Sequence, residues 1–154
     1  MKAETEQVIR DWLTQFLRII GEPLEFELRP DRGNVLINLR GVRSIAPQDY
    51  ETLKAIAYLL EVVVRRRAGE GVRVQLDIDG YRDKRRAELR EMALQLAAEA
   101  LRERKRIRLN PMEPWERKAI HEALSDYQGV RTYSEGQGKE RRVIIEPEVE
   151  LARG

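Results

Sequence analysis

The chain has 154 residues, of which 42% are hydrophobic and 36% charged, and its formal net charge is +2. This length suits one compact domain or two small ones, with enough apolar residues for a buried core. With no cysteine and one histidine, the sequence excludes disulfides, thiolate metal sites and multi-histidine metal centres, and we expect no cofactor. Because no run approaches the ~20 apolar residues of a membrane span and charges occur throughout the N-terminal segment, we expect a cytoplasmic protein.

The first half of the chain shows a pattern of helix, strand, strand, helix, strand. Apolar residues at i, i+3 and i+4 predict the helices, and short apolar or alternating runs predict the strands. This order folds as helices over a three-stranded sheet, an α+β arrangement. The predicted elements are a helix over residues 4–20, a hairpin of Leu24–Leu28 and Val35–Leu39 around the link RPDRGN, a helix over Tyr50–Arg67 and a strand over Val72–Ile78.

The second half predicts two helices and three short strands, again an α+β arrangement. A long helix over residues 80–105 joins the two halves, and a second, amphipathic helix follows with apolar Trp115, Ile120, Ala123 and Leu124. Strands are expected near Arg106–Leu109, Val130–Ser134 and Arg142–Ile145, the last two joined by the polar loop SEGQGKE. We therefore expect domains at 1–79 and 80–147, with a frayed tail at 148–154.

Arg117 and His121 lie four residues apart on the second of these helices and so share one face. A guanidinium and an imidazole on one face, beside Lys118, form a joint donor surface that suits phosphate. The same spacing also occurs in a solvated polar stripe, because such a pair gains only a few tenths of a kcal/mol and needs no functional reason. The spacing alone leaves both interpretations open.

The segment LNPMEPWERKAIHEALSDYQGVRTYSEGQGKERRVIIEP resembles the R-three-H domain, named for Arg-x-x-x-His, here Arg117 and His121. The resemblance includes the closing basic strand with Arg141 and Arg142. It is closest to the R-three-H domain of bacterial Jag (KhpB-like) proteins, which carry a KH domain before it. The resemblance implies that this part binds single-stranded RNA or DNA.

Basic residues concentrate in the middle of the chain, where residues 61–108 contain 14 basic and nine acidic side chains. If the fold brings them together, Arg82, Arg85 and Arg86 could follow a phosphate backbone beside Arg117. An Arg-rich and Glu-rich surface is also typical of the ion-pair networks of heat-adapted proteins. Both interpretations remain open for each cluster.

The segments TLKAIAYLLEVVVRRR and VQLDIDGYRDKRRAEL resemble the KH domain of Jag-type proteins. A KH domain grips nucleotide backbones with a G-x-x-G turn, whose glycines let the main chain approach phosphate. The corresponding positions here are Pro47, Gln48, Asp49 and Tyr50. Since both glycines are absent and Asp49 repels phosphate, we expect a degenerate KH-like domain that serves as a platform or as a surface for a protein partner.

No catalytic site is expected. Asp77 and Asp79 share a strand face but have no nucleophile or metal set nearby, and no P-loop, GxGxxG, HExxH or Ser/His/Asp arrangement is present. The leading hypothesis is a non-catalytic protein that binds single-stranded RNA through the Arg117 and His121 face. The alternative is a structural or interaction module that contacts a protein partner, and an enzyme or nuclease comes third. Trp115, at a core-facing position, is predicted to be a buried anchor and not a base-stacking platform.

Overall fold

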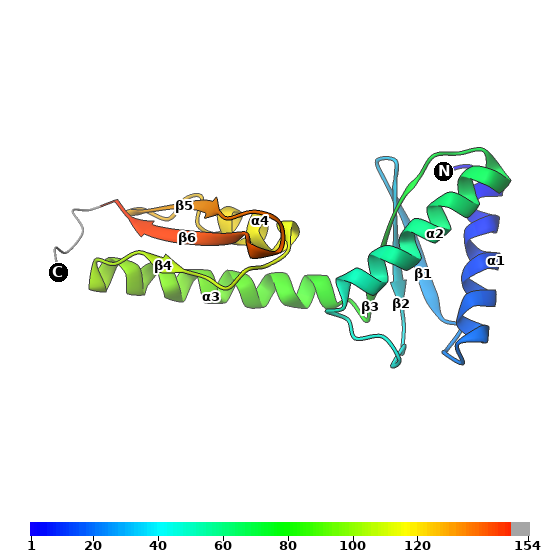
Figure 1. Ribbon diagram of the computed structural model, residues 1–154, viewed down its shortest axis with the longest axis horizontal. Coiled ribbons are helices and arrows are strands. Elements are labelled where there is room, and N and C mark those ends of the chain that lie inside the picture. Colours follow the sequence, from blue (N-terminus) through cyan, green and yellow to red (C-terminus); the bar gives the residue numbers. More distant parts are fainter. Residues whose placement is uncertain (149–154) are drawn as a thin grey trace. The chain divides into compact units, whose positions relative to one another are not determined.

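The computed structural model describes residues 1–148 and divides into two compact units, 1–82 and 83–154. The described residues form four α-helices and two three-stranded sheets (Figure 1), which confirms the predicted α+β fold class. Of the predicted tail, only Glu148 is described, and its N–H donates a hydrogen bond to the carbonyl of Gly129 at 2.7 Å. The remainder of that prediction lies outside the described residues.

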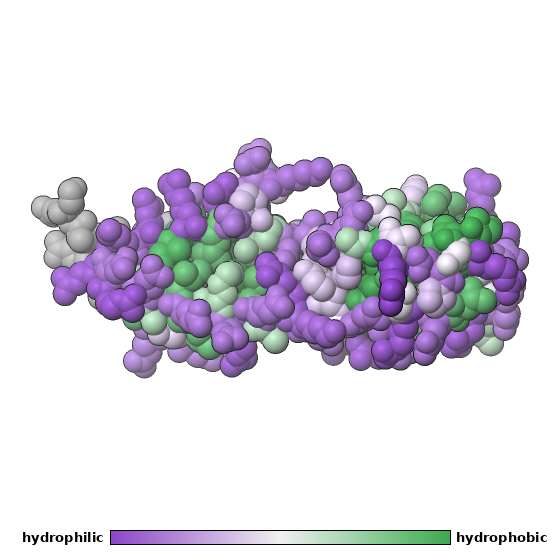
Figure 2. Space-filling model, turned by 90° about the horizontal axis from the view of Figure 1, so that it is seen from below, coloured by the Kyte–Doolittle hydropathy of each residue, from purple (hydrophilic) through white to green (hydrophobic). Residues whose placement is uncertain are grey.

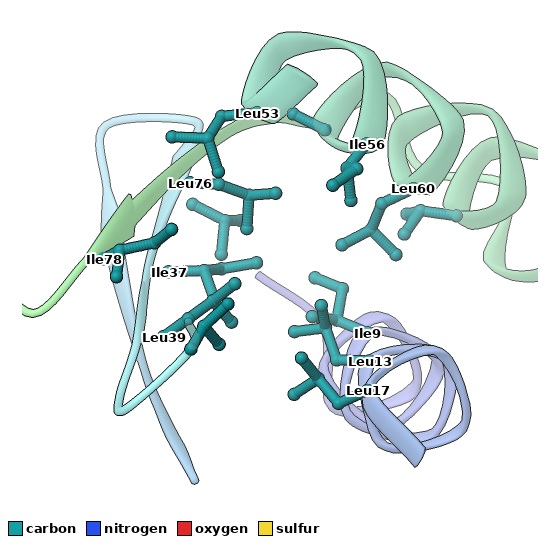
Figure 3. Close-up of a cluster of buried hydrophobic side chains, with 14 of the residues drawn as sticks. Ile9, Leu13, Leu17, Ile37, Leu39, Leu53, Ile56, Leu60, Leu76 and Ile78 are labelled. Carbon is teal, nitrogen blue, oxygen red and sulfur yellow. The ribbon is translucent and has the colours of Figure 1, made fainter. Parts of the chain in front are cut away.

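The first unit has the predicted order of elements and one apolar core. In its sheet, ordered β1-β2-β3, β1 pairs antiparallel with β2, and β2 pairs parallel with β3. Figure 3 shows side chains from both helices meeting those of β2 and β3, including Leu13, Leu60 and Leu76. The elements are α1 (Ala3–Ile19), β1 (Phe26–Asp31), β2 (Asn34–Leu39), α2 (Tyr50–Ala68) and β3 (Arg73–Ile78).

The hairpin between β1 and β2 has a tighter turn than the link RPDRGN predicted. Pro30 and Asp31 belong to β1, which tolerates a proline because it is an edge strand. Only Arg32 and Gly33 connect the strands, both with positive φ, 49° and 83°. A two-residue turn with two positive φ values matches the right-handed twist of the strands it joins, so the pairing continues up to the turn.

The second unit packs two helices against one face of an antiparallel sheet. Its sheet order is β4-β6-β5, so the last strand of the chain lies in the centre. Figure 1 shows α3 running along the length of this sheet. The elements are α3 (Tyr81–Glu103), whose first two residues fall in the first unit, β4 (Ile107–Arg108), α4 (Pro114–Ala123), β5 (Val130–Glu135), a 3-10 turn η1 (Gly138–Glu140) and β6 (Arg142–Pro147).

The strands of this sheet alternate between two faces of different character. On the helix face, Val143 and Ile145 of β6 pack with Leu89 and Ala93 of α3 and Ile120 of α4. The opposite side is called the outer face here. It carries Arg106 and Arg108 from the β4 segment, Arg142, Ile144 and Glu146 from β6, and Arg131, Tyr133 and Glu135 from β5.

Hydrophilic side chains cover most of the side of the molecule seen in Figure 2, with smaller apolar areas between them. This surface agrees with the 36% charged composition. Among the described residues, no helix combines the length and apolar character needed to cross a membrane.

Candidate nucleic-acid interface

Helix α4 is started by a proline and an acidic side chain. Pro114 occupies the first helical position, where its missing N–H costs nothing. The Glu116 carboxylate accepts a hydrogen bond from the Glu113 N–H at 3.1 Å, which satisfies a backbone donor at the helix end. This local chemistry sets where α4 begins and so which residues face β5.

His121 is held by two hydroxyl groups of β5. Its Nδ1 lies 2.7 Å from Oγ1 of Thr132, and its Nε2 lies 3.0 Å from Oγ of Ser134. Thr132 and Ser134 are two apart on a strand and therefore share the helix face. Both ring nitrogens are thus occupied within the protein, and the imidazole does not offer a free donor to a ligand.

Two arginines lie close enough to His121 to act on its charge. Burial is the main effect that lowers the pKa of His121 below its ordinary value, and the guanidiniums of Arg117 and Arg141 lower it further. Arg117 belongs to α4, and Arg141 immediately precedes β6. The three side chains form what we call the histidine cluster, in which burial and two positive neighbours keep the imidazole neutral at pH 7.

Both arginines of the histidine cluster are tied to backbone carbonyls. The Nε of Arg117 donates to the carbonyl of Met112 at 3.3 Å, and Nη1 of Arg141 donates to the carbonyl of Gly136 at 2.8 Å. The N–H of Met112 in turn donates to the carbonyl of Arg141 at 3.3 Å. The peptide groups of Met112 therefore link the side chain of one arginine to the backbone of the other.

Two other residues predicted to join this surface point elsewhere. Lys118 is exposed and its Nζ lies 3.8 Å from the carboxylate of Glu122, one turn further along α4. Arg142 follows Arg141 on β6 and so lies on the outer face, where its guanidinium is 3.9 Å from Glu140.

The three predicted arginines of α3 are engaged in separate contacts. Arg82 lies in the first unit, with its guanidinium carbon 5.7 Å from the Tyr50 ring centre. Arg85 donates from Nε to Glu116 at 2.9 Å. Arg86 lies over the Trp115 ring at 5.3 Å and reaches Asp83 at 3.1 Å. The structure thus joins Arg117, His121 and Arg141, and gives the other predicted residues different neighbours.

The second unit corresponds in sequence to a known domain family. Residues 87–147 match the model of the R-three-H domain. This chain contains an R-three-H domain. It is 28% identical to the RNA-binding protein KhpB of Clostridium symbiosum, over 94% of this chain and 69% of that protein. It is 33% identical to the RNA-binding protein KhpB of Bacillus subtilis, over 79% of this chain and 55% of that protein. The chain thus spans little more than half the length of the second relative.

Trp115 of the R-three-H domain, predicted to be a buried anchor, is half-buried, and its Nε1 is buried. It occupies the second position of α4, close to the start of α3, where the Arg86 guanidinium lies over the ring. A side chain in the first turn of a short helix lies at the end of the core, which accounts for the part of Trp115 that remains exposed.

In the first unit, the loop at the position of a G-x-x-G turn contains a carboxylate that caps the helix after it. Asp49 caps α2, accepting hydrogen bonds from the Thr52 N–H at 3.2 Å and the Thr52 hydroxyl at 2.7 Å. These hydrogen bonds hold the pKa of Asp49 below its ordinary value. A negative group therefore occupies a helix N-terminus, which is where a phosphate would otherwise be favoured.

Sequence reasoning missed Thr132 and Ser134, the two hydroxyls that hold the histidine of the R-three-H domain. A signal was present, because they alternate with Arg131 and Tyr133 in a predicted strand and so belong to one face. Among the described residues, no group of three or more His, Asp or Glu side chains is arranged to hold a metal ion.

Proposed function

We propose that this protein binds single-stranded RNA through the histidine cluster of its R-three-H domain, without catalysing a reaction. The observation that carries this proposal is the convergence of Arg117 and Arg141, from separate elements, around a neutral His121. Two oriented guanidiniums suit the phosphates of a nucleic-acid backbone. The names of two bacterial relatives as RNA-binding proteins support RNA over DNA.

In this proposal His121 acts through Thr132 and Ser134. A neutral imidazole accepts a hydrogen bond from one hydroxyl and donates one to the other, so only one hydroxyl proton points outward. A protonated imidazole donates from both nitrogens, and both hydroxyl protons are then free to bond a phosphate. Protonation thus adds a charge and an outward donor together.

The first unit has a supporting role in this proposal. Its order of helix, strand, strand, helix, strand supports a degenerate KH-like domain at 1–79, followed by the R-three-H domain at 80–147. Tyr58 and Leu59 are exposed on α2 and would serve a protein partner, which is the role proposed for this half. We place the protein in the cytoplasm, where such a partner and RNA are both accessible.

Arg117→Ala is the test of the proposed site. We expect it to weaken binding to oligouridylate about tenfold, since a hydrogen bond to a charged group is lost. The slope of log K against log salt should flatten by about 0.7, the loss of one single-strand phosphate contact. Fluorescence anisotropy titrations at several salt concentrations measure both quantities.

The matched control for this test is Lys118→Ala, which removes the same charge one residue away. Its side chain is exposed and paired with Glu122, so we expect the affinity to change by less than about twofold. Equal losses in the two variants would indicate attraction to overall charge, and unchanged affinity in an Arg117→Ala protein that melts like the parent would refute the proposed site.

A second test concerns the loop of the first unit. The triple change Pro47→Gly, Asp49→Asn and Tyr50→Gly restores both glycines and removes the negative charge, while asparagine still caps the helix. We expect the RNA affinity to increase, because the negative charge at the helix N-terminus is removed and the glycines let the main chain approach phosphate. Anisotropy titration against the single variant Asp49→Asn separates the glycines from the charge. No gain in a folded triple variant would contradict the KH-like assignment of this loop.

A further inference from the structure

The outer face of the R-three-H sheet concentrates arginines around a tyrosine. The strand register places Arg131 beside Glu146, and Tyr133 beside Ile144, which on its other side pairs with Arg108. None of these side chains takes part in the helix-face core. The histidine cluster lies on the helix side of β5, so the two surfaces are separated by the sheet.

One nearly buried carboxylate organises the outer face. The Glu146 side chain is only 10% exposed, and it accepts a hydrogen bond from Nε of Arg131 at 2.6 Å. Nε of Arg106 lies 3.9 Å from the same carboxylate. Because each guanidinium has five donors, both arginines keep donors for a ligand after pairing with Glu146.

The Tyr133 side chain contacts both of these guanidiniums. Nη1 of Arg106 donates to the Tyr133 hydroxyl at 3.5 Å, and the guanidinium carbon of Arg131 is 5.8 Å from the ring centre. Ile144 is 1% exposed, so the surrounding side chains cover the apolar floor of this surface. Planar, oriented groups of this kind are those on which unpaired bases stack.

The charge and polarity of this face favour a nucleic acid over a protein partner. The four arginines have three glutamate partners: Glu146 for Arg106 and Arg131, Glu135 for Arg108, and Glu140 for Arg142. The side chains of Arg108 and Arg131 nevertheless remain 63% and 64% exposed. A protein partner would bury apolar surface, yet the apolar side chain here, Ile144, is already covered. A polyanion with planar bases satisfies both the exposed charge and the stacking surface.

We propose that the outer face, through Tyr133, Arg106, Arg108 and Arg131, is a second contact surface for the single-stranded RNA, on which a base stacks against the tyrosine ring. This inference rests on the proposed function, and it adds base contacts to the phosphate contacts of the histidine cluster. The two surfaces together would engage a longer stretch of RNA than either one alone.

The test compares Tyr133→Leu with Tyr133→Phe in the full chain, using anisotropy titration with oligouridylate. Leucine still covers Ile144 but has no ring, and we expect it to weaken binding at least about fivefold, the lower range for loss of one stacked base. Phenylalanine keeps the ring and should bind within about twofold of the parent. Thermal melts of both variants establish that the sheet is intact.

The Arg117→Ala variant distinguishes failure of this inference from failure of the proposed function. Parent-like binding by Tyr133→Leu, with weak binding by Arg117→Ala, would overturn the second surface and leave the first in place. Weak binding by Tyr133→Leu, with parent-like binding by Arg117→Ala, would support the outer face and exclude the histidine cluster as an RNA contact. Equal weakening by leucine and phenylalanine, or competition by polyglutamate as effective as that by oligouridylate, would overturn base stacking.

Discussion

Arg85→Ala is expected to lower the free energy of unfolding of the R-three-H domain by about 2–3 kcal/mol. Glu116 is 8% exposed at the side chain and Arg85 is 30% exposed, so their 2.9 Å contact is largely shielded from water. Without Arg85, a nearly buried carboxylate loses its closest charged partner. The full figure of about 3–5 kcal/mol for a buried pair is reduced because Arg85 is partly solvated. Urea unfolding followed by circular dichroism measures the change.

The double variant Arg85→Met with Glu116→Gln is the control for this prediction. Glutamine keeps an acceptor for the Glu113 N–H at the start of α4, and removal of both charges leaves no unpaired carboxylate. We expect most of the lost stability to return. A double variant no more stable than Arg85→Ala would mean that the arginine acts through packing. If Arg85→Ala melts like the parent and binds RNA weakly, Arg85 contacts RNA directly instead.

Lowering the pH is expected to strengthen RNA binding through His121, by up to about tenfold per pH unit. In the free protein, burial and two guanidiniums lower the pKa of His121 below about 6.5, its ordinary value. A bound phosphate favours the imidazolium and raises this pKa, so binding takes up a proton. Affinity therefore increases as the pH falls from the pKa of the complex to that of the free protein. His121→Gln, which does not titrate, should show much less pH dependence.

The same shift has the opposite effect on stability. Because the folded pKa of His121 lies below the unfolded value, the unfolded chain binds the proton more tightly. The contribution of His121 to stability is complete above about pH 6.5 and is lost as the pH falls through the folded pKa.

Isothermal titration of the protein with RNA, in buffers of different ionisation enthalpy, measures the proton uptake on RNA binding. Proton release, or no uptake in the parent, would contradict the linkage.

The helices and strands could be predicted because their signals are local. The apolar repeat of α1 and α2 and the alternation in β2 and β3 each follow from one segment, and the structure confirms them. The start of α4 was also readable, since Pro114 and Glu116 are ordinary residues for a first helical turn. The length of the hairpin turn was overestimated because Pro30 belongs to the strand, which an edge strand permits. The sequence of one segment does not show whether its strand lies at the edge of the sheet.

The partners of the arginines could not be predicted in the same way. Arg85 and Arg86 are adjacent in a basic run, yet one meets Glu116 and the other Trp115. These partners are about 30 residues away in the sequence, and only the packing of α4 against α3 brings them together. Charge patterning therefore indicated a basic region correctly, but it could not distinguish an arginine with an internal partner from one available to a ligand.

The peptide groups of Met112 have a consequence for the entropy and kinetics of binding. They connect the Arg117 side chain to the backbone of Arg141, whose guanidinium donates to the carbonyl of Gly136, so both guanidiniums are held in place before RNA arrives. Ordering a long side chain on binding costs about 0.5–1.5 kcal/mol, and here much of that loss of freedom occurs during folding. A histidine cluster organised in this way binds without a slow rearrangement, and differences in affinity among RNAs should then appear mainly in their dissociation rates.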